Sequence, residues 1–394
     1  MKKYLKQNMQ LIYSLEEIPD KLDKSIFLAG PTPRTTAAES WRPEFIEILE
    51  QIGYDGVVFI PEYRDGPQKN LAKSEQIEWE HKCINACDAL VFWVAREMRS
   101  DFEMLALTTN IEFGLFLSTG KVFAGCPDGT QHIDYFKEIS KDQLTWHNDM
   151  LGLAQEAVSY IGIGAHREGT ETLVPLGLWR SNQFQDWYAA QKSAGNHLEN
   201  IKELWRFVMP KAKKLFMTVF KPDVYVAAEK RVKSNEFVVA RTNISHVLAY
   251  TSKDNILDTK VVLVKEFRSP AATIDGFVHE LPGGSSIKEN VDPLQTASDE
   301  LAEEVGLRLD PSRFRQVKTL QCNATLASHK ATLFAVELTN EEMNKLEADR
   351  TVHGIAEDTE QTYIEIRTVK QILEEDLLDW TNRGMLLSGI YKSL

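Results

Sequence analysis

Residues 25–162 alternate between short apolar runs and helix-forming segments, and this alternation is the strongest constraint on the fold. The apolar runs have the length of strands: SIFLA at 25–29, GVVFI at 56–60, ALVFWV at 89–94 and KVFAG at 121–125. Segments with helical character follow them, at 40–53, 76–87, 110–119 and 151–160. A strand that is apolar on both sides must be covered on both faces, which is typical of parallel sheets. We therefore predict an N-terminal α/β domain with a parallel sheet of the Rossmann or flavodoxin-like kind.

The residues that follow each predicted strand are the candidate site residues, because such sheets bind ligands at the carboxyl ends of their strands. Gly30 and Pro31 follow the first strand and can fix a loop whose amides face a ligand; a plain turn is the alternative. Glu112 is expected in the first turn of its helix, where the helix dipole favours the ionised carboxylate. Such a carboxylate can attack a glycosidic carbon, whereas the alternative is a glutamate that only complements the dipole.

This region also resembles the nucleoside 2-deoxyribosyltransferase superfamily. The matching segments are Phe27–Arg34, Ser40–Pro43, Gln76–Glu80, Asp88, Thr109–Gly114 and Gly120–Lys121. In that superfamily the glutamate at the position of Glu112 is the nucleophile on C1′ of a nucleoside. The resemblance implies that the domain breaks or exchanges an N-glycosidic bond. It also implies substrate contacts by Gly30, Pro31, Asp88 and Asn110.

The resemblance is incomplete at the position of the proton donor. Characterised transferases carry an acidic residue shortly before the nucleophile, but this chain has Ala106 there, and Asp101 and Glu103 are out of register. The source of the proton for the leaving base is therefore open, and hydrolysis is an alternative to transfer. Trp41 and Trp79 could stack a base or simply pack in the core.

Composition and charge narrow the class of partner. With 394 residues, 43% of them hydrophobic, the chain has room for two domains. A net charge of −13 without a basic run argues against a nucleic-acid surface. We predict no signal peptide, no membrane span and a cytoplasmic location. The four cysteines suggest neither a disulfide framework nor a metal site, and Cys83 and Cys87 are expected to be packing thiols.

The chain changes character after residue 162. Residues 163–200 form a predicted ordered connector, because they hold six large apolar residues: Leu176, Leu178, Trp179, Phe184, Trp187 and Tyr188. From residue 201 strand-like runs predominate, with predicted helices among them. We therefore place a first domain at 23–162, the connector at 163–200 and a second domain with a mixed sheet at 201–394.

The predicted helix in this second domain has an acidic face. Its start and stop signals are Asp292, Pro293 and Gly306. Glu300, Glu303 and Glu304 stand at i, i+3 and i+4 and so share one face. Like charges at this spacing destabilise a helix by a few tenths of a kcal/mol each, and no Lys or Arg lies within the turn. A hard divalent cation such as Mg²⁺ would make the arrangement favourable; a solvated acidic face is the alternative.

The stretch His279–Leu307 resembles the Nudix box, whose second half corresponds here to Asp299–Leu307. The resemblance implies an α/β/α sandwich and a Mg²⁺ (or Mn²⁺) ion bound by Glu300, Glu303 and Glu304. It also implies catalytic roles for Glu303 and Glu304. Flanking residues are similar to the ADP-ribose pyrophosphatase branch of that family, which implies substrate contacts by Arg268, Glu280 and Gly284.

Two features depart from the Nudix pattern. Asp299 replaces the family's arginine, which normally braces the glutamates, and the spacing from Gly283 and Glu289 to this position is two residues longer. A general base is expected from a late acidic loop, where the candidates are Glu357, Asp358, Thr359 and Glu360; a solvated loop is the alternative. His329 is either a substrate-facing residue or an ordinary core or surface histidine.

Together these features predict a bifunctional enzyme of nucleotide metabolism that acts on small nucleosides and nucleotides. The second domain would hydrolyse a nucleoside diphosphate linked to another group, such as ADP-ribose, and the first would cleave or transfer an N-glycosidic bond. The alternative is a sensor whose altered Nudix box binds such a ligand without hydrolysing it. Both resemblances imply a homodimer.

Overall fold

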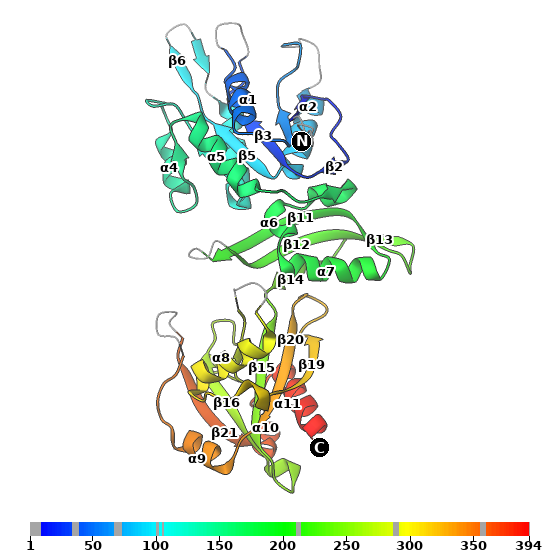
Figure 1. Cartoon of the computed structure of the whole chain (residues 1–394), viewed down its shortest axis with the longest axis vertical. Helices are drawn as coiled ribbons and strands as arrows, with labels where there is room; N and C mark the ends of the chain where they lie inside the picture. Colours follow the sequence, from blue (N-terminus) through cyan, green and yellow to red (C-terminus); the bar gives the residue numbers. More distant parts are fainter. Residues whose placement is uncertain are drawn as a thin grey trace, which may run out of the picture. The chain divides into compact units, whose positions relative to one another are not determined.

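The computed structural model describes residues 9–33, 39–66, 73–99, 102–104, 106–209, 214–286, 291–354 and 360–393. The chain divides into two compact units (Figure 1). The first unit comprises Met1–Phe207 and Thr218–Phe237, and the second comprises Val208–Met217 and Val238–Leu394. No helix among the described residues has the length and apolar character needed to cross a membrane.

The first unit is built on a six-stranded parallel sheet with the order β1-β4-β3-β5-β8-β9. The bounds are β1 Gln10–Tyr13, β3 Ser25–Ala29, β4 Val57–Ile60, β5 Ala89–Trp93, β8 Val122–Gly125 and β9 Trp146–His147. The predicted α/β class and the four central strands are confirmed. All residues of β3, β4, β5 and β8 are buried. The sequence analysis missed the edge strands β1 and β9, because they lack a continuous apolar run.

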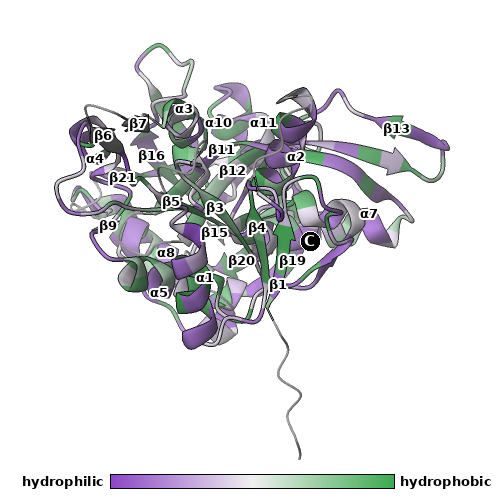
Figure 2. Cartoon of the chain, turned by 90° about the horizontal axis from the view of Figure 1, so that it is seen from above, coloured by the Kyte–Doolittle hydropathy of each residue, from purple (hydrophilic) through white to green (hydrophobic). Residues whose placement is uncertain are grey.

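Helices cover both faces of this sheet, as the apolar strands require. They are α1 Arg42–Gln51, α2 Lys73–Ala86, α3 Leu107–Phe116, α4 Asp134–Ser140 and α5 Met150–Ile161. Trp79 and Cys83 of α2 and Phe113 of α3 belong to the hydrophobic cluster on one face. Phe45 of α1 and Leu153 of α5 belong to the cluster on the other. Cys83 and Cys87 are buried free thiols, as predicted. In Figure 2 the hydrophobic colour follows the strands and the hydrophilic colour lies mainly on helices and hairpins.

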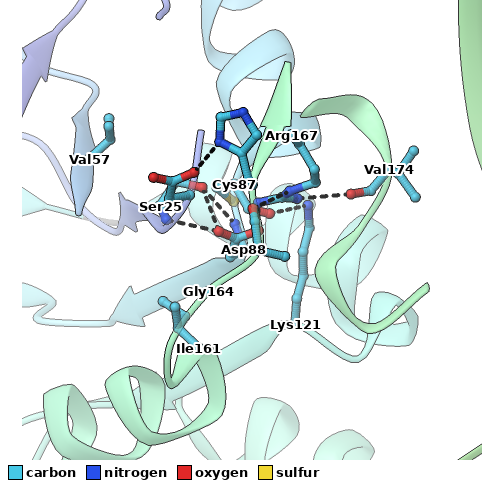
Figure 3. A network of polar contacts seen from close by, with 12 residues as sticks. Ser25, Val57, Cys87, Asp88, Lys121, Ile161, Gly164, Arg167 and Val174 are labelled. Carbon is cyan, nitrogen blue, oxygen red and sulfur yellow. Dashed lines mark hydrogen bonds and ion pairs between the residues drawn. The ribbon is translucent and has the colours of Figure 1, made fainter. Parts of the chain in front are cut away.

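A buried ion pair lies at the amino edge of this sheet (Figure 3). Asp88, just before β5, accepts hydrogen bonds from the Ser25 backbone N–H at 2.9 Å and from Arg167 Nη2 at 2.5 Å. Both charged side chains are completely buried. Arg167 also donates to the carbonyl of Val174 at 3.0 Å, so it joins two segments that are distant in sequence. Lys121, before β8, donates to three carbonyls at the end of α2 and beyond: those of Ile84, Asn85 and Cys87.

Residues after 162 continue the first unit. Strand β10 Arg167–Glu168 pairs with β2 Lys21–Leu22, and the helices α6 Leu176–Trp179 and α7 Asn182–Ser193 follow. The ring of Phe184 contacts the rings of Trp179, Trp187, Tyr188 and Phe220. The aromatic residues of this segment therefore pack together. The strands β11 His197–Met209, β12 Lys214–Val226 and β13 Arg231–Lys233 then lie side by side in one sheet.

The second unit contains a seven-stranded mixed sheet with the order β17-β16-β15-β20-β19, to which β18 and β21 are added. Its strands are β15 Ile244–Thr251, β16 Lys260–Phe267, β17 Phe277–Glu280, β18 Gly283–Gly284, β19 Arg315–Gln321, β20 Lys330–Glu337 and β21 Thr362–Thr368. Strand β15 is parallel to β20 and antiparallel to β16. A short strand, β14 Val238–Arg241, precedes β15. The prediction of a second domain with a mixed sheet is confirmed.

Helices also lie on both faces of the second sheet. Helices α8 Pro293–Val305 and α9 Asn340–Ala348 pack in one hydrophobic cluster, and α10 Val369–Glu374 and α11 Trp380–Ser393 pack in another. The sequence signals that bound α8 are confirmed. The Asp292 carboxylate accepts from the Leu294 N–H at 3.0 Å, and Gly306 ends the helix with φ +67°. This φ favours glycine because it lies in the left-handed region.

The Asp88–Arg167 ion pair provides a test of the first unit. Asp88→Asn should lower the free energy of unfolding by about 3–5 kcal/mol, because it leaves the Arg167 charge buried without a counter-charge. The nearby exposed Lys21–Glu168 pair supplies the control, and Glu168→Gln should change the stability little. Denaturant unfolding followed by circular dichroism measures both. Equal stability of the two variants would show that the buried pair is not important for the fold.

Candidate functional site

The loop after β3 is fixed by Arg42, whose side chain is 1% exposed. Arg42 donates from Nε to the Leu28 carbonyl and from Nη2 to the Gly30 carbonyl, both at 3.0 Å. Its Nη1 pairs with the Glu62 carboxylate and lies 3.4 Å from the Pro31 carbonyl oxygen. Gly30 and Pro31 therefore form a fixed rim at the carboxyl edge of the sheet, and their contact with a ligand stays a prediction.

Gly30 cannot be replaced without a backbone shift. Its φ is +148°, and an added Cβ would lie 2.5 Å from the Trp93 carbonyl oxygen. The same Cβ would approach the Trp41 ring to 3.1 Å. The glycine thus allows the chain to pass closely between Trp93 and Trp41, and a residue with a side chain would not fit there.

Glu112 lies in the second turn of α3, because the helix begins at Leu107. The prediction that Glu112 is in the first turn was therefore wrong, and so was the expected effect on its charge. Burial and the nearby Glu80 raise the pKa of Glu112 to about 7, and Arg42 only partly offsets them. Without a helix N-terminus beside it, desolvation has the largest effect.

A second carboxylate, Glu80 of α2, interacts with Glu112. Gln76 Nε2 donates to Glu80 Oε1 at 2.9 Å, and the Tyr63 hydroxyl donates to Gln76 Oε1 at 3.2 Å. Burial raises the pKa of Glu80, while the bond from Gln76 and the charge of Arg42 lower it. The sequence analysis gave Glu80 no role. The available signal was the i, i+4 spacing from Gln76, which lets the amide orient the carboxylate.

Glu80 raises the pKa of Glu112, and burial raises the pKa of Glu80. Two half-buried carboxyl groups of this kind can divide acid and nucleophile roles between them. Arg42 interacts electrostatically with both Glu80 and Glu112. The pair stands at the carboxyl edge of the sheet, beside the Gly30–Pro31 rim that Arg42 also holds. Glu80 is therefore a candidate for the proton donor that Ala106 leaves open.

Asn110 lies two residues before Glu112 on α3. Its Oδ1 accepts from Arg96 Nη2 at 2.5 Å, and Arg96 Nη1 donates to the His132 carbonyl at 2.8 Å. Arg96 follows β5, so Asn110 is held at the carboxyl edge, near the predicted nucleophile. This placement favours the predicted contact between Asn110 and a substrate.

Asp88 is not brought together with these residues. It lies at the amino edge of the sheet, where Ser25 and Arg167 use both of its carboxylate oxygens. This placement favours a structural role. Both tryptophans proposed to stack a base are 7% exposed and belong to hydrophobic clusters. Trp79 Nε1 donates to the Glu16 carbonyl at 2.8 Å.

Comparison with known proteins identifies part of the chain. The sequence model of a family described as "Nucleoside 2-deoxyribosyltransferase like" matches residues 23–130. Residues 23–130 form a nucleoside 2-deoxyribosyltransferase-like domain. Such a domain implies an enzyme that transfers or cleaves the N-glycosidic bond of nucleosides. No curated protein matches the chain.

The match contains every residue of the carboxyl-edge site of this deoxyribosyltransferase-like domain, from Gly30 to Glu112. It ends before Arg167, the buried partner of Asp88. The first unit is therefore larger than the matched domain. The match also ends well before the second unit, whose candidate site must be judged from its own residues.

In the second unit, the carboxylates of Glu266, Glu304 and Glu360 converge. One oxygen from each lies within 4.8 Å of the others, and Glu266 and Glu304 are buried. They come from β16, α8 and the residue two before β21. Three convergent carboxylates could hold a metal ion.

The cluster differs from the predicted ligand set of Glu300, Glu303 and Glu304. Only Glu304 belongs to both sets, and Glu303 is exposed. Burial, followed by the charges of Glu303, Glu360 and Asp299, raises the pKa of Glu300 to about 7. Glu300 is thus electrostatically linked to the cluster. Helical spacing alone identified one face of α8, but the other carboxylates of the cluster come from β16 and from the segment before β21.

The Gly283–Gly284 strand lies against the acidic face of α8. The Gly283 N–H donates to Glu304 Oε2 at 2.8 Å. A Cβ added at Gly284 would lie 2.4 Å from Glu300 Oε1. Gly284 therefore allows close approach of the strand to the carboxylates; no ligand contact is needed to explain it.

Arg268 and Glu280, the predicted substrate contacts, are paired with each other. Arg268 Nε and Nη2 both donate to Glu280 Oε2, at 3.2 and 3.1 Å. Arg268 Nη2 also lies 2.9 Å from Glu266 Oε2, in a geometry that is not a hydrogen bond. The Arg268–Glu280 pair therefore borders the carboxylate cluster.

The donor set fits a divalent cation. Glu266 Oε2 is buried and receives no hydrogen bond from the described residues. Burial raises the pKa of Glu266 and raises that of Glu304 well above its usual range, since nearby carboxylates add to the desolvation. A cation among these oxygens would stabilise their ionised forms and give a second cationic partner to the Glu266 oxygen that Arg268 already approaches.

The candidates for a general base have different outcomes. Glu357, Asp358 and Thr359 lie outside the described residues, as do Arg34 and Glu289. Glu360, the last of the four loop candidates, belongs to the cluster instead. His329 is half-buried, between β19 and β20.

Binding of Mn²⁺ to the full chain tests this cluster. Glu266→Gln and Glu304→Gln should each weaken binding at least about tenfold, because each removes a ligand charge. The exposed Glu341→Gln on α9 is the control. Electron paramagnetic resonance of free Mn²⁺ gives the affinities.

Glu303→Gln separates the predicted ligand set from the observed cluster. Unchanged Mn²⁺ affinity in this variant is the result expected from the cluster. A large loss in Glu303→Gln, with normal binding in Glu266→Gln, would instead support the set predicted from sequence.

Proposed function

We propose that the N-terminal domain breaks the N-glycosidic bond of a nucleoside or nucleotide, with Glu112 as the nucleophile and Glu80 as the proton donor. The observation that carries this proposal is the coupled Glu80–Glu112 pair at the carboxyl edge of the sheet. The raised pKa of Glu80 favours the protonated form that an acid needs, and a pKa of about 7 leaves part of Glu112 ionised as a nucleophile at neutral pH.

The proposed reaction has two steps. In the first, the Glu112 carboxylate forms a bond to C1′ while the C1′–N bond breaks, and the Glu80 carboxyl group gives its proton to the leaving base. In the second, water or another base attacks C1′, Glu112 leaves as a carboxylate, and Glu80 takes the proton of the attacking group. Arg42 assists by stabilising the ionised form of Glu112.

For the second unit we propose Mg²⁺-dependent (or Mn²⁺-dependent) hydrolysis of a nucleoside diphosphate linked to another group, of the ADP-ribose type. We thus assign 23–162 and 201–394 to two enzymatic domains joined by 163–200. Support comes from the Nudix-like α8 segment together with the carboxylates of Glu266, Glu304 and Glu360. These residues would hold the ion, which when bound would neutralise diphosphate charge and orient water.

One observation favours a sensor as the second candidate. Asp299 replaces the arginine of the Nudix pattern, and its carboxylate accepts from Gln295 Nε2 at 2.9 Å. This contact lies within the exposed side of α8 and brings no positive charge to Glu300. A site without this brace could retain the ligand and lose turnover.

Product analysis with matched variants assigns each activity to its domain. Glu112→Gln should reduce release of free base from nucleosides by at least about a thousandfold, because it removes the nucleophile, and leave diphosphate hydrolysis unchanged. Glu304→Gln should have the reverse effect. The substrates are nucleosides, nucleoside monophosphates and ADP-ribose with Mg²⁺, with products separated by chromatography.

Two results would contradict these assignments. If neither variant lowered any turnover, both site assignments would be wrong. If ADP-ribose bound to the wild-type chain with Mg²⁺ but gave no AMP, the sensor would replace the hydrolase.

The pH profile tests the raised pKa of Glu112. Burial and Glu80 place this pKa at about 7. Below that pH the nucleophile is protonated, so kcat/KM for base release should rise with pH toward about 7. It should fall again at higher pH, where Glu80 loses the proton that it must donate. In Glu80→Gln the like charge is absent, so the rise should occur at lower pH.

A nucleoside whose base carries a positive charge through N-methylation tests the proton-donor role of Glu80 separately, because its base leaves without protonation. On this substrate Glu80→Gln should remain active and Glu112→Gln should not. Equal loss in both variants would exclude the division into acid and nucleophile.

A further inference from the structure

Three buried polar atoms in two neighbouring segments of the second unit have no hydrogen-bond partner among the described residues. They are Arg241 Nε, Thr242 Oγ1 and His329 Nδ1. Arg241 ends β14, Thr242 follows it, and His329 directly precedes β20. Buried polar groups are normally satisfied, so an unsatisfied set from two chain segments suggests a missing partner.

Arg241 has a positive charge without a counter-charge. No carboxylate among the described residues forms an ion pair with it. Its guanidinium lies over the Phe216 ring, 5.3 Å from the centroid, and Nη2 donates to the Ser285 hydroxyl at 3.3 Å. Burial and the nearby Arg268 lower the pKa of Arg241. A half-buried charge without a counter-charge is unfavourable, and an anionic ligand would compensate it.

His329 and Thr242 add neutral groups that can form hydrogen bonds. Burial and then the charge of Arg241 lower the pKa of His329, so its imidazole is neutral near pH 7. A neutral imidazole offers one donor and one acceptor, and a hydroxyl can donate to an anion. The set therefore provides one fixed positive charge and up to two further donors, which suits the several acceptor oxygens of a phosphoryl group.

The location agrees with a phosphorylated ligand. Arg241 interacts electrostatically with Arg268, and Arg268 contacts both Glu266 of the carboxylate cluster and Glu280. Ser285, which Arg241 holds, follows the Gly283–Gly284 strand that lies against Glu300 and Glu304. Arg268 thus interacts both with the carboxylate cluster and with Arg241.

We propose that Arg241, Thr242 and His329 form a binding site for a phosphoryl group that is separate from the metal-binding carboxylates. The proposal deepens the proposed diphosphate chemistry and rests on it for the identity of the natural ligand. The site itself requires no metal. Arg241 provides the charge, and His329 and Thr242 direct hydrogen bonds to the phosphoryl oxygens.

Calorimetric titration of the full chain with inorganic pyrophosphate in the presence of EDTA tests the site. Arg241→Gln should weaken pyrophosphate binding at least about tenfold, because it removes a charge-assisted contact. Its Mn²⁺ affinity should stay that of the wild type. Arg308→Gln, which changes an exposed arginine of the same unit, is the control and should bind pyrophosphate normally.

His329→Gln keeps the proposal testable if Arg241→Gln does not fold, and should weaken pyrophosphate binding by a smaller factor. Wild-type pyrophosphate affinity in a folded Arg241→Gln or His329→Gln variant would overturn the proposal. Repeating the titration with inorganic phosphate separates the possible sources. Equal affinities indicate a site for a single phosphate group, and a preference for pyrophosphate indicates a diphosphate.

The result is independent of the proposed hydrolysis. Loss of pyrophosphate binding in Arg241→Gln, in a protein that hydrolyses no diphosphate, would retain the anion site and remove the hydrolase. Normal pyrophosphate binding in Arg241→Gln, with hydrolysis that depends on Glu304, would remove the anion site and retain the hydrolase.

Discussion

The buried ion pair between Asp88 and Arg167 is the contact on which the first unit depends. Each partner is completely enclosed, and burial of a charge costs several kcal/mol unless a counter-charge and hydrogen bonds compensate it. Asp88 therefore fixes Ser25 at the start of β3, and Arg167 fixes Val174. Because Arg167 lies beyond the matched residues 23–130, the deoxyribosyltransferase-like fold is completed by chain from outside its family match.

The two edges of this sheet differ in how their charges are satisfied. At the amino edge the charges of Asp88 and Lys121 are surrounded by partners. At the carboxyl edge Arg42 donates to the loop carbonyls and pairs with Glu62. It also interacts electrostatically with Glu80 and Glu112, which form no ion pair with any described residue. The satisfied edge stabilises the fold. The carboxyl edge retains the carboxyl groups with raised pKa that the proposed reaction would need.

In the second unit, too, the residues that stabilise the fold differ from the charged residues that could bind a ligand. Apolar residues of α8, among them Ala297 and Leu301, pack in the core. Glu304 of the same helix lies close to the carboxylates of Glu266 and Glu360. The carboxylates of the cluster and the Arg241 guanidinium, which forms no ion pair with a carboxylate of the described residues, lie in one unit and have opposite charge. Neither is explained by stability, because each would be more favourable with a partner of opposite sign. A metal-bound, phosphorylated ligand would supply both partners.

Local pattern in the sequence predicted the parts of the structure that depend on neighbours along the chain. The four central strands were evident because both of their faces are apolar, and α8 was evident from Asp292, Pro293 and Gly306. Glu112 was found through resemblance, but its environment was predicted wrongly. Helix α3 begins three residues before the predicted segment 110–119. Burial, rather than the helix dipole, has the largest effect on the pKa of the Glu112 carboxyl group.

By itself, then, the sequence determined the α/β class, the four central strands of the first sheet, helix α8, and the glutamates on α3 and α8. Tertiary structure decided which groups meet. It paired Asp88 with Arg167 across 79 residues, placed Glu80 beside Glu112, and brought Glu266 and Glu360 to Glu304. The physical reason is that periodicity is set by local backbone geometry. Charge, desolvation and pKa depend instead on neighbours that only the packed fold brings into contact.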